Sequence, residues 1–219
     1  MISEFKQIED LFKEIDDKLT KKVNIYIIGG AALLYEGLKP TTKDIDLIIE
    51  NENELIYFNK ALISLNFIHN APTAVYKKME LDTIVIRDDY RIDAFLKKVC
   101  KKFALSKNMI KRSKELLKLK NILVYKCSNE DIFLFKSMTE RPGDLDDCIE
   151  LVKKGLNWNI IKNELFDQIK NNGQDVWITW IGESFDKLLK KGLDIPIMND
   201  IDKLIKKYYN KNLKKRGIK

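Results

Sequence analysis

The sequence predicts an α/β (mixed α+β) fold, in which a small mixed sheet is flanked by helices and followed by a helical region. Short runs rich in β-branched residues alternate with stretches of helical periodicity up to residue 127. From residue 128 onward only helical periodicity remains. Neither an internal repeat nor a low-complexity linker interrupts the 219 residues. We therefore divide the chain into a core at 1–127 and a helical C-terminal domain at 128–219.

The first 65 residues predict alternating helices and strands. Near the N-terminus apolar residues recur every three or four positions, which is typical of an amphipathic helix. A β-branched run then ends at Gly29 and Gly30, as a strand does where it meets a turn. The predicted elements are helices at 3–20, 31–35 and 52–65 and strands at 23–28 and 45–49.

The next part of the chain predicts more strands, and the remainder predicts helices. Polar turns at 88–90 and 120–121 each separate two strand candidates. Trp158, Trp177 and Trp180 lie in the helical part and are expected to pack in its core. The predicted strands are 75–78, 81–87, 91–95, 116–119 and 122–125, and the predicted helices begin after residue 128 and cover 144–154, 158–170 and 176–190.

The charge of the chain favours acidic partners. Its formal net charge is +7 and its isoelectric point is about 9.1. The stretch 203–219 holds eight Lys or Arg residues and no acid. It is either a solvated helix or a patch that binds RNA or DNA phosphates, with Tyr208 and Tyr209 available for stacking on bases.

Composition excludes several protein classes. No apolar run approaches the roughly 20 residues that a membrane helix needs. The acidic, amphipathic N-terminus is not expected to be a signal peptide. Three widely separated cysteines and a single histidine, His69, do not predict a zinc site. We expect the cysteines to be reduced thiols in a cytoplasmic protein, and the lack of a long apolar run predicts no membrane partner.

Two aspartates interrupt the most apolar predicted strand. Asp44 and Asp46 flank Ile45, and residues two apart in a strand point to the same face. Neighbouring carboxylates repel each other unless a cation joins them, and Mg²⁺ prefers oxygen ligands. If the predicted strand 91–95 pairs beside this one, Asp93 adds a third carboxylate. The three can then hold two Mg²⁺ ions, with Mn²⁺ the alternative ion. Taken singly, an Asp-x-Asp pair is equally consistent with a solvated strand end.

Gly29 and Gly30 suggest a place for phosphates. At the start of a helix they would bring backbone N–H groups close to an anion, with no Cβ in the way. Two glycines after a strand are often only a turn, so this expectation depends on the aspartates.

Together these motifs resemble the nucleotidyltransferase superfamily that includes DNA polymerase beta. Its pattern is a hydrophobic residue, Gly-Gly or Gly-Ser, a gap, Asp-hydrophobic-Asp-hydrophobic, and a third carboxylate on a later strand. Here thirteen residues separate Gly30 from Asp44, and the resemblance covers 25–95. It implies transfer of a nucleoside monophosphate from an NTP to a hydroxyl, with release of pyrophosphate. Asp44 and Asp46 would bind both metal ions, and Asp93 would bind the catalytic one and accept a proton.

The stretch "SNEDIFLFKSMTERPGDLDDCIELV" resembles a segment of stand-alone prokaryotic nucleotidyltransferases, including the AbiEii-family toxins. The resemblance implies that Lys136 contacts the triphosphate and that Asp144 or Asp147 assists the site. Lys136 is otherwise a solvent-facing lysine, and Asp144 a helix cap. Many members have Gly-Ser where this chain has Gly-Gly, so Thr42 and Lys43 are expected to supply replacement phosphate contacts, unless they only form a polar turn.

The acceptor is left open by the sequence. An RNA or tRNA 3′ end is expected first, because of the basic character and the toxin-like segment, and an antitoxin protein is then an expected partner. A small molecule and a protein are the alternative acceptors. A non-catalytic nucleotide-binding or nucleic-acid-binding module on the same fold, and an Asp-x-Asp glycosyltransferase, are alternatives of other classes. Three mutually repelling aspartates argue against the first, and Gly29 and Gly30 would be unexplained in the second.

Overall fold

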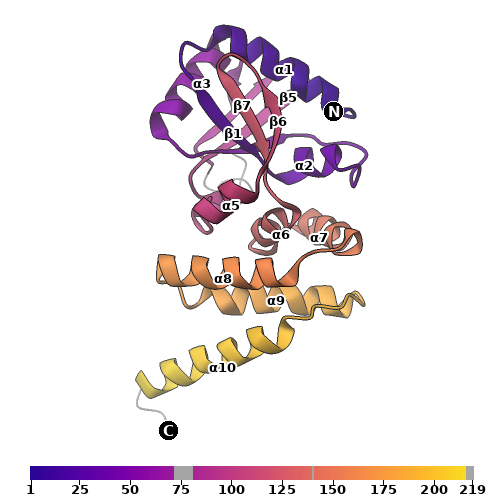
Figure 1. Cartoon of the computed structure of the whole chain (residues 1–219), viewed down its shortest axis with the longest axis vertical. Coiled ribbons are helices and arrows are strands. Elements are labelled where there is room, and N and C mark those ends of the chain that lie inside the picture. Colours follow the sequence, from indigo (N-terminus) through magenta and orange to yellow (C-terminus); the bar gives the residue numbers. More distant parts are fainter. Residues whose placement is uncertain (72–80, 140, 216–219) are drawn as a thin grey trace. The chain divides into compact units, whose positions relative to one another are not determined.

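The computed structural model describes residues 1–71, 81–139 and 141–215. The chain divides into two compact units, Met1–Ser128 and Asn129–Lys219. The described strands all belong to the first unit, and the described elements of the second are helices (Figure 1). The predicted mixed α/β fold with a helical C-terminal region is confirmed. Within the described ranges, no helix has the length and apolarity needed to cross a bilayer.

The described part of the first unit is built around a seven-stranded mixed sheet with the order β3-β4-β5-β2-β1-β7-β6. β1 (Val23–Ile27) pairs parallel with β7 (Ile122–Lys126), and β2 (Ile45–Ile49) pairs parallel with β5 (Tyr90–Leu96). The other neighbouring pairs, including β1 with β2, are antiparallel. The remaining strands are β3 (Ile68–His69), β4 (Thr83–Arg87) and β6 (Lys114–Lys118).

Helices cover the centre of this sheet. α3 (Glu52–Ser64) packs on β1 and β2, and α1 (Phe5–Lys18) packs against α3 (Figure 1). The apolar residues that predict the first helix are buried, because Ile8, Leu11, Phe12 and Ile15 all lie on its inner face. α2 (Gly29–Tyr35) contacts β2. The remaining elements of this unit are the 3₁₀ turn η1 (Val99–Lys101) and the helix α5 (Lys107–Arg112).

The central position of β2 explains its unusual sequence. All five of its residues are buried, and the strand lies between β5 and β1 in the middle of the sheet. A strand in this position should be apolar throughout, yet Asp46 lies within it. The structure therefore places a carboxylate inside the core, where it requires a compensating partner.

The structure differs from the predicted elements by one to three residues at several boundaries, and it contains short elements that were not predicted. α2 begins at Gly29 rather than at residue 31, because Gly29 adopts a φ of +63° and lets the helix start directly after the strand. The two-residue strand β3 and the six-residue helix α5 lack a pattern long enough to be predicted. β6 begins two residues before the predicted strand 116–119. The predicted strand 75–78 lies outside the described residues.

The second unit consists, in its described part, of five helices. Asn157 caps α8 by accepting hydrogen bonds from the backbone N–H groups of Asn159 and Ile160, and Gly173 ends that helix with a φ of +63°. Trp177 is buried, whereas Trp180 is 41% exposed, so the prediction that it packs in the core is wrong. The helices are α6 (Asn129–Ser137), α7 (Pro142–Lys154), α8 (Trp158–Asn172), α9 (Trp177–Lys190) and α10 (Met198–Lys215).

Candidate active site

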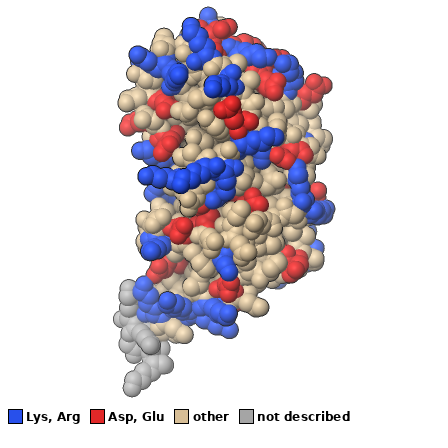
Figure 2. All heavy atoms as spheres, in the orientation of Figure 1, with Lys and Arg blue, Asp and Glu red and all other residues tan. Residues whose placement is uncertain are grey.

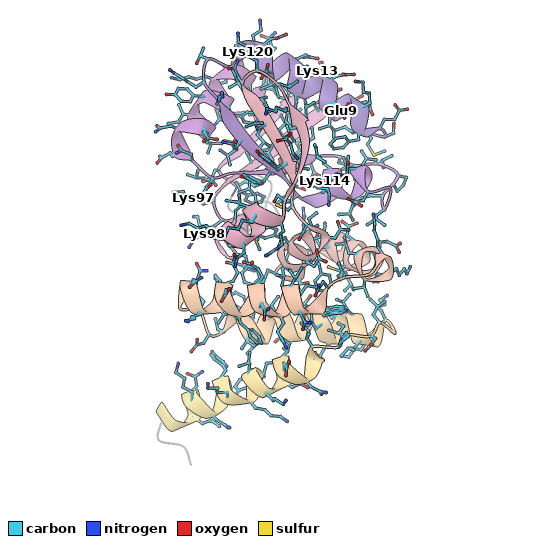
Figure 3. All side chains as sticks on the ribbon, viewed as in Figure 1. Glu9, Lys13, Lys97, Lys98, Lys114 and Lys120 are labelled. Atoms are coloured by element: carbon cyan, nitrogen blue, oxygen red, sulfur yellow. The ribbon has the colours of Figure 1, made fainter. Side chains whose placement is uncertain are left out.

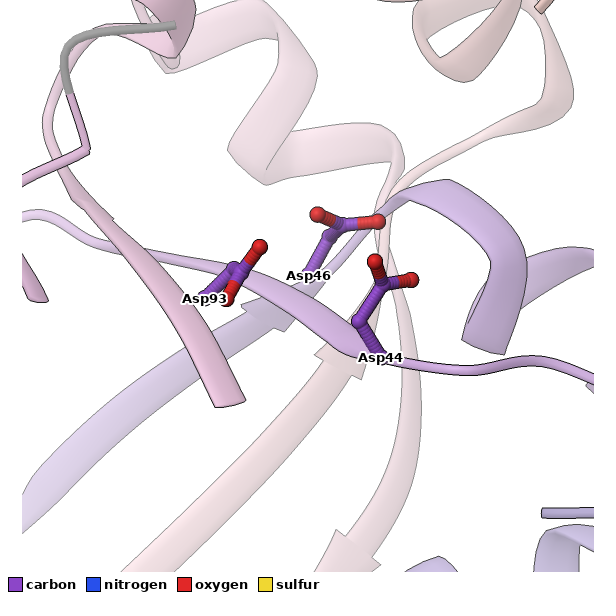
Figure 4. A group of neighbouring side chains, drawn as sticks. All are labelled: Asp44, Asp46 and Asp93. Atoms are coloured by element: carbon purple, nitrogen blue, oxygen red, sulfur yellow. The ribbon is translucent and has the colours of Figure 1, made fainter. Parts of the chain in front are cut away.

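Three carboxylates converge at one end of β2. In the parallel pairing of β2 with β5, Asp46 stands directly opposite Asp93, so the two side chains share a face of the sheet. Asp44 precedes Asp46 by two positions and points the same way (Figure 4). One carboxylate oxygen of each residue lies within 4.8 Å of those of the other two. Residues separated by about fifty positions in sequence thus form a single acidic cluster.

Gly29 makes room for this cluster. Its backbone follows β1, and the preceding N–H of Ile28 donates a hydrogen bond to the carbonyl oxygen of Asp46 at 3.0 Å. A Cβ atom at residue 29 would stand 2.7 Å from Cγ and 2.8 Å from Cβ of Asp46. The Asp46 side chain therefore occupies the space that any other residue at position 29 would fill. At Gly30 a Cβ atom would stand 3.2 Å from Cβ of Thr42 and closer still to its hydroxyl.

Arg91 is a site residue that the sequence reasoning missed. Asp93 is fully buried, and its two oxygens accept hydrogen bonds from Nε and Nη2 of Arg91 at 2.7 and 2.8 Å. This two-point contact between guanidinium and carboxylate is the strongest kind of ion pair in proteins. Arg91 lies two residues before Asp93 in the same strand, so the two side chains share a face. This spacing could have predicted Arg91 as a site residue from the sequence. It places one positive charge beside the three acids.

The donor set fits a divalent cation that prefers oxygen. All three ligand groups are carboxylates, which suits Mg²⁺ or Mn²⁺ better than zinc. Asp46 and Asp93 are buried while Asp44 is half-buried, so the cluster can be reached from one side. With Arg91 counted, the local formal charge is about −2, which a single divalent ion would neutralise. The residues present therefore fit the metal that the sequence predicts.

Thr42 and Lys43 lie in the loop that leads to Asp44. Thr42 is buried, and its hydroxyl donates a hydrogen bond to the carbonyl oxygen of Asp44 at 2.9 Å. The proton that we expected to reach a phosphate is thus directed at the backbone of the loop itself. Lys43 is exposed, and its ammonium group can approach a ligand.

The neighbouring end of the sheet carries two further lysines. β7 runs parallel to β1, and Lys126 at its end lies opposite Ile27. Lys126 is buried and pairs with Glu36 at 3.1 Å. Lys114, which is labelled in Figure 3, lies on β6 opposite Lys126. Its ammonium donates a hydrogen bond to the Tyr35 hydroxyl at 2.9 Å. Both cations contact the C-terminal end of α2, and neither was predicted as a site residue.

Lys136, Asp144 and Asp147 form a second cluster, which lies in the helical unit. Nζ of Lys136 donates hydrogen bonds to Oδ1 of Asp144 at 2.9 Å and to Oδ2 of Asp147 at 2.6 Å. Arg141 and Thr139 also donate to Asp144. Lys136 is buried rather than facing solvent. The structure thus brings together the three residues that the toxin-like segment singled out, and their roles toward a nucleotide stay predictions.

Electrostatics hold this second cluster in its charged form. Burial opposes the charge on Lys136, but attraction to Asp144 and Asp147 outweighs it and raises the lysine pKa above 10.5. For Asp144, burial favours the neutral acid, but Lys136 and the hydrogen bonds from Arg141 and Thr139 lower its pKa to about 2. The three side chains therefore behave as one ion-paired unit at neutral pH.

Comparison with known proteins agrees with this geometry. The sequence profile of a family described as "Nucleotidyltransferase of unknown function (DUF6036)" matches residues 3–177. Among solved structures, the chain is similar to ANT(2″)-Ia in complex with adenylyl-2″-tobramycin, with a TM-score of 0.50 and 12% identity over 77% of this chain and 98% of that one. A provisionally assigned nucleotidyltransferase from Thermotoga maritima matches with a TM-score of 0.40 and 14% identity over 61% of this chain and 83% of that one. No curated protein sequence matches the chain.

The similarity to ANT(2″)-Ia shows a shared fold, and the family match covers four fifths of the sequence. The acidic cluster lies within the matched range. The chain therefore belongs to the nucleotidyltransferase family DUF6036 and to the nucleotidyltransferase superfamily.

Proposed function

We propose that this nucleotidyltransferase moves a nucleoside monophosphate from an NTP to a hydroxyl acceptor and releases pyrophosphate. The observation that carries the proposal is the register of β2 and β5, which sets Asp46 opposite Asp93 and beside Asp44. The chemistry of these three acids matches the family to which the chain belongs.

Each carboxylate has a separate task in this proposal. Asp44 and Asp46 would hold the divalent ions, and Asp93 would hold the ion nearest the acceptor. When bound, two Mg²⁺ ions, or Mn²⁺ in their place, would supply Lewis acidity that activates the hydroxyl and neutralises the leaving group. Arg91 fixes the orientation of Asp93, because it donates hydrogen bonds to both carboxylate oxygens.

The chemical step is a displacement at the α-phosphorus of the NTP. The acceptor oxygen forms the new bond to phosphorus, the bond to the bridging oxygen breaks, and pyrophosphate leaves with that oxygen. Asp93 takes the proton that the hydroxyl loses. The protein mainly positions the reactants and compensates charge, so correct placement of the three acids is the central requirement.

The backbone beside the acids is where we place the phosphates. Gly29 and Gly30 have no Cβ atoms, so their backbones lie directly beside the side chains of Asp46 and Thr42. Lys43 is exposed in the adjoining loop and supplies a charge for the triphosphate. We assign the Lys136, Asp144 and Asp147 cluster to the nucleotide as well, on the strength of the toxin-like segment. We assign Thr42 a structural role in the loop that carries Asp44, rather than a contact with phosphate.

For the acceptor we propose an RNA 3′ end, with tRNA the first choice. α10 carries lysines at 203, 206, 207 and 211, and Figure 2 shows basic side chains gathered along this helix. Tyr208 lines a groove of about 540 Å³ between α8, α9 and α10, together with Lys170, Lys207 and Lys211. Asp175 also lines this groove and pairs with Lys211 at 2.6 Å, which leaves Lys170 and Lys207 for phosphates and Tyr208 for stacking on a base. The toxin-like role and an antitoxin partner depend on the resemblance of the segment that begins at Ser128. None of the three cysteines, all of which lie in the described part of the chain, forms a disulfide, and on that ground we propose a cytoplasmic location.

Transfer of label identifies the acceptor. The full chain is incubated with each of the four NTPs labelled at the α-phosphate, Mg²⁺ and total RNA, and label is then measured in RNA, protein and small-molecule fractions. We expect label in RNA and release of pyrophosphate. Label in the protein or small-molecule fraction would show that the acceptor belongs to that class and not to RNA. Absence of transfer to any fraction, with RNA binding intact, would support the non-catalytic module.

A further inference from the structure

Asp44 is held differently from the other two acids. Asp46 and Asp93 lie inside paired strands, and their backbones are fixed by the sheet. β2 begins only at Ile45, so Asp44 belongs to the loop that precedes it. Repulsion from the two buried carboxylates would move the least restrained acid outward. Something other than the sheet must therefore fix Asp44.

The N-terminal residues contact this loop. Ile2 and Thr42 form an isolated antiparallel bridge, in which the N–H of Ile2 donates to the carbonyl of Thr42 at 3.0 Å and the N–H of Thr42 donates to that of Ile2 at 2.9 Å. The Ile2 side chain is only 1% exposed. This bridge attaches the loop to the body of the unit, two residues before Asp44.

The side chain of Thr42 connects the bridge to Asp44 itself. Its hydroxyl donates a hydrogen bond to the Asp44 carbonyl oxygen at 2.9 Å, while the side chain is 3% exposed. The same hydroxyl fills the space beside Gly30 that a Cβ atom there would need. Thr42 therefore touches the N-terminal bridge, the backbone of Asp44 and the glycine turn at the same time.

We infer that Ile2 and Thr42 are positioning residues for Asp44, and that they prepare the acidic cluster to bind its divalent ion. This inference rests on the proposed function, because it assumes that Asp44 is a metal ligand. It adds that the N-terminal segment is part of the active-site machinery, although its residues do not belong to the acidic cluster. The physical basis is preorganisation: the loop is ordered during folding, so ion binding need not order it.

The test compares three substitutions by their affinity for Mn²⁺. Thr42→Val removes the hydroxyl at nearly constant volume, and Thr42→Ser retains it. Thr20→Val makes the same change at an exposed threonine and serves as the control. Mn²⁺ binding to the full chain is measured by electron paramagnetic resonance, with no nucleotide present. Loss of one neutral hydrogen bond should raise the Kd of Thr42→Val about fivefold. Thr42→Ser and Thr20→Val should bind as the wild type does.

A second readout reports on the loop directly. Hydrogen exchange at the Thr42 amide should accelerate in a chain that lacks residues 1–3, because its acceptor, the Ile2 carbonyl, is gone. That chain should also bind Mn²⁺ more weakly than Thr42→Val does. Equal Mn²⁺ affinity of Thr42→Val and wild type, or equal weakening by Val and Ser, would overturn the inference. A wild-type chain that binds no Mn²⁺ would overturn the metal assignment of the proposed function as well.

Discussion

Replacing Gly29 with alanine adds one carbon atom where the Asp46 side chain lies. Two effects follow from the structure. First, Gly29 has a φ of +63°, a conformation that costs an L-residue about 1–2 kcal/mol. Second, the new Cβ would stand 2.7 Å from Cγ and 2.8 Å from Cβ of Asp46. Overpacking of this kind in a closed core costs about 1–3 kcal/mol. The sum predicts that the free energy of unfolding falls by about 2–5 kcal/mol.

Gly37→Ala is the matched control. Gly37 has a φ of +69°, but a Cβ atom there would meet nothing within 4 Å. This substitution should therefore cost only the backbone contribution, about 1–2 kcal/mol. The difference between the two variants measures the contact with Asp46 alone.

Urea unfolding and Mn²⁺ binding are the assays. If Asp46 yields to the new methyl group, part of the stability returns but the metal ligand is misplaced. We therefore expect the Gly29→Ala variant to bind Mn²⁺ at least about tenfold more weakly than Gly37→Ala, whichever way the clash is relieved. A Gly29→Ala variant that matches Gly37→Ala in both stability and Mn²⁺ affinity would refute the assignment of Gly29 to the site.

Three further predictions concern other residues. Asp46→Asn should abolish label transfer, while its circular dichroism spectrum and melting temperature stay close to those of the wild type. Asp17→Asn, a control at an exposed position, should leave transfer intact. Transfer by the Asp46→Asn variant would contradict the metal assignment. Asp144, whose pKa falls from 3.8 to about 2 on folding, should contribute about 2 kcal/mol of stability that is present above pH 4 and lost as the pH falls toward 2. The carboxyl of Asp144 has a lower pKa in the folded than in the unfolded chain, so its protonation in acid destabilises the fold. In urea unfolding curves, an Asp144→Asn variant should lose less stability between about pH 4 and pH 2 than the wild type. Identical pH profiles of the two proteins would disprove this prediction. Burial raises the pKa of the Cys148 thiol to about 12, so a thiol reagent should modify Cys148 only after unfolding, and modification of the native chain at the rate of a free thiol would contradict the burial.

The acidic cluster was within reach of sequence reasoning because its geometry follows from a local rule. Alternation along a strand puts Asp44 and Asp46 on one face without knowledge of the rest of the fold. Asp93 required the further assumption that its strand pairs beside β2. The register that sets it opposite Asp46 is a property of the whole sheet, and no local pattern specifies it.

Contacts between side chains were harder to predict from the sequence than the positions of the three acids. Arg91 reads in the sequence as one more charged residue at a strand end, and only the buried neighbour shows that it completes the site. Thr42 was expected to face a phosphate, yet its hydroxyl bonds the backbone two residues on. Lys136 was weighed against a solvent-facing role, and the structure encloses it between two acids that lie eight and eleven residues away. In each case the missing information was which distant side chain shares the space.

The Arg91–Asp93 pair also bears on the order in which this protein is assembled. Three acids in one pocket would oppose folding of a chain that has not yet met its ion, but the guanidinium offsets one of the charges in advance. If the cluster binds a divalent ion as proposed, we therefore expect the chain to fold before it binds that ion, in contrast to small domains whose folding requires a metal. The same reasoning predicts that removal of the ion would leave the fold intact.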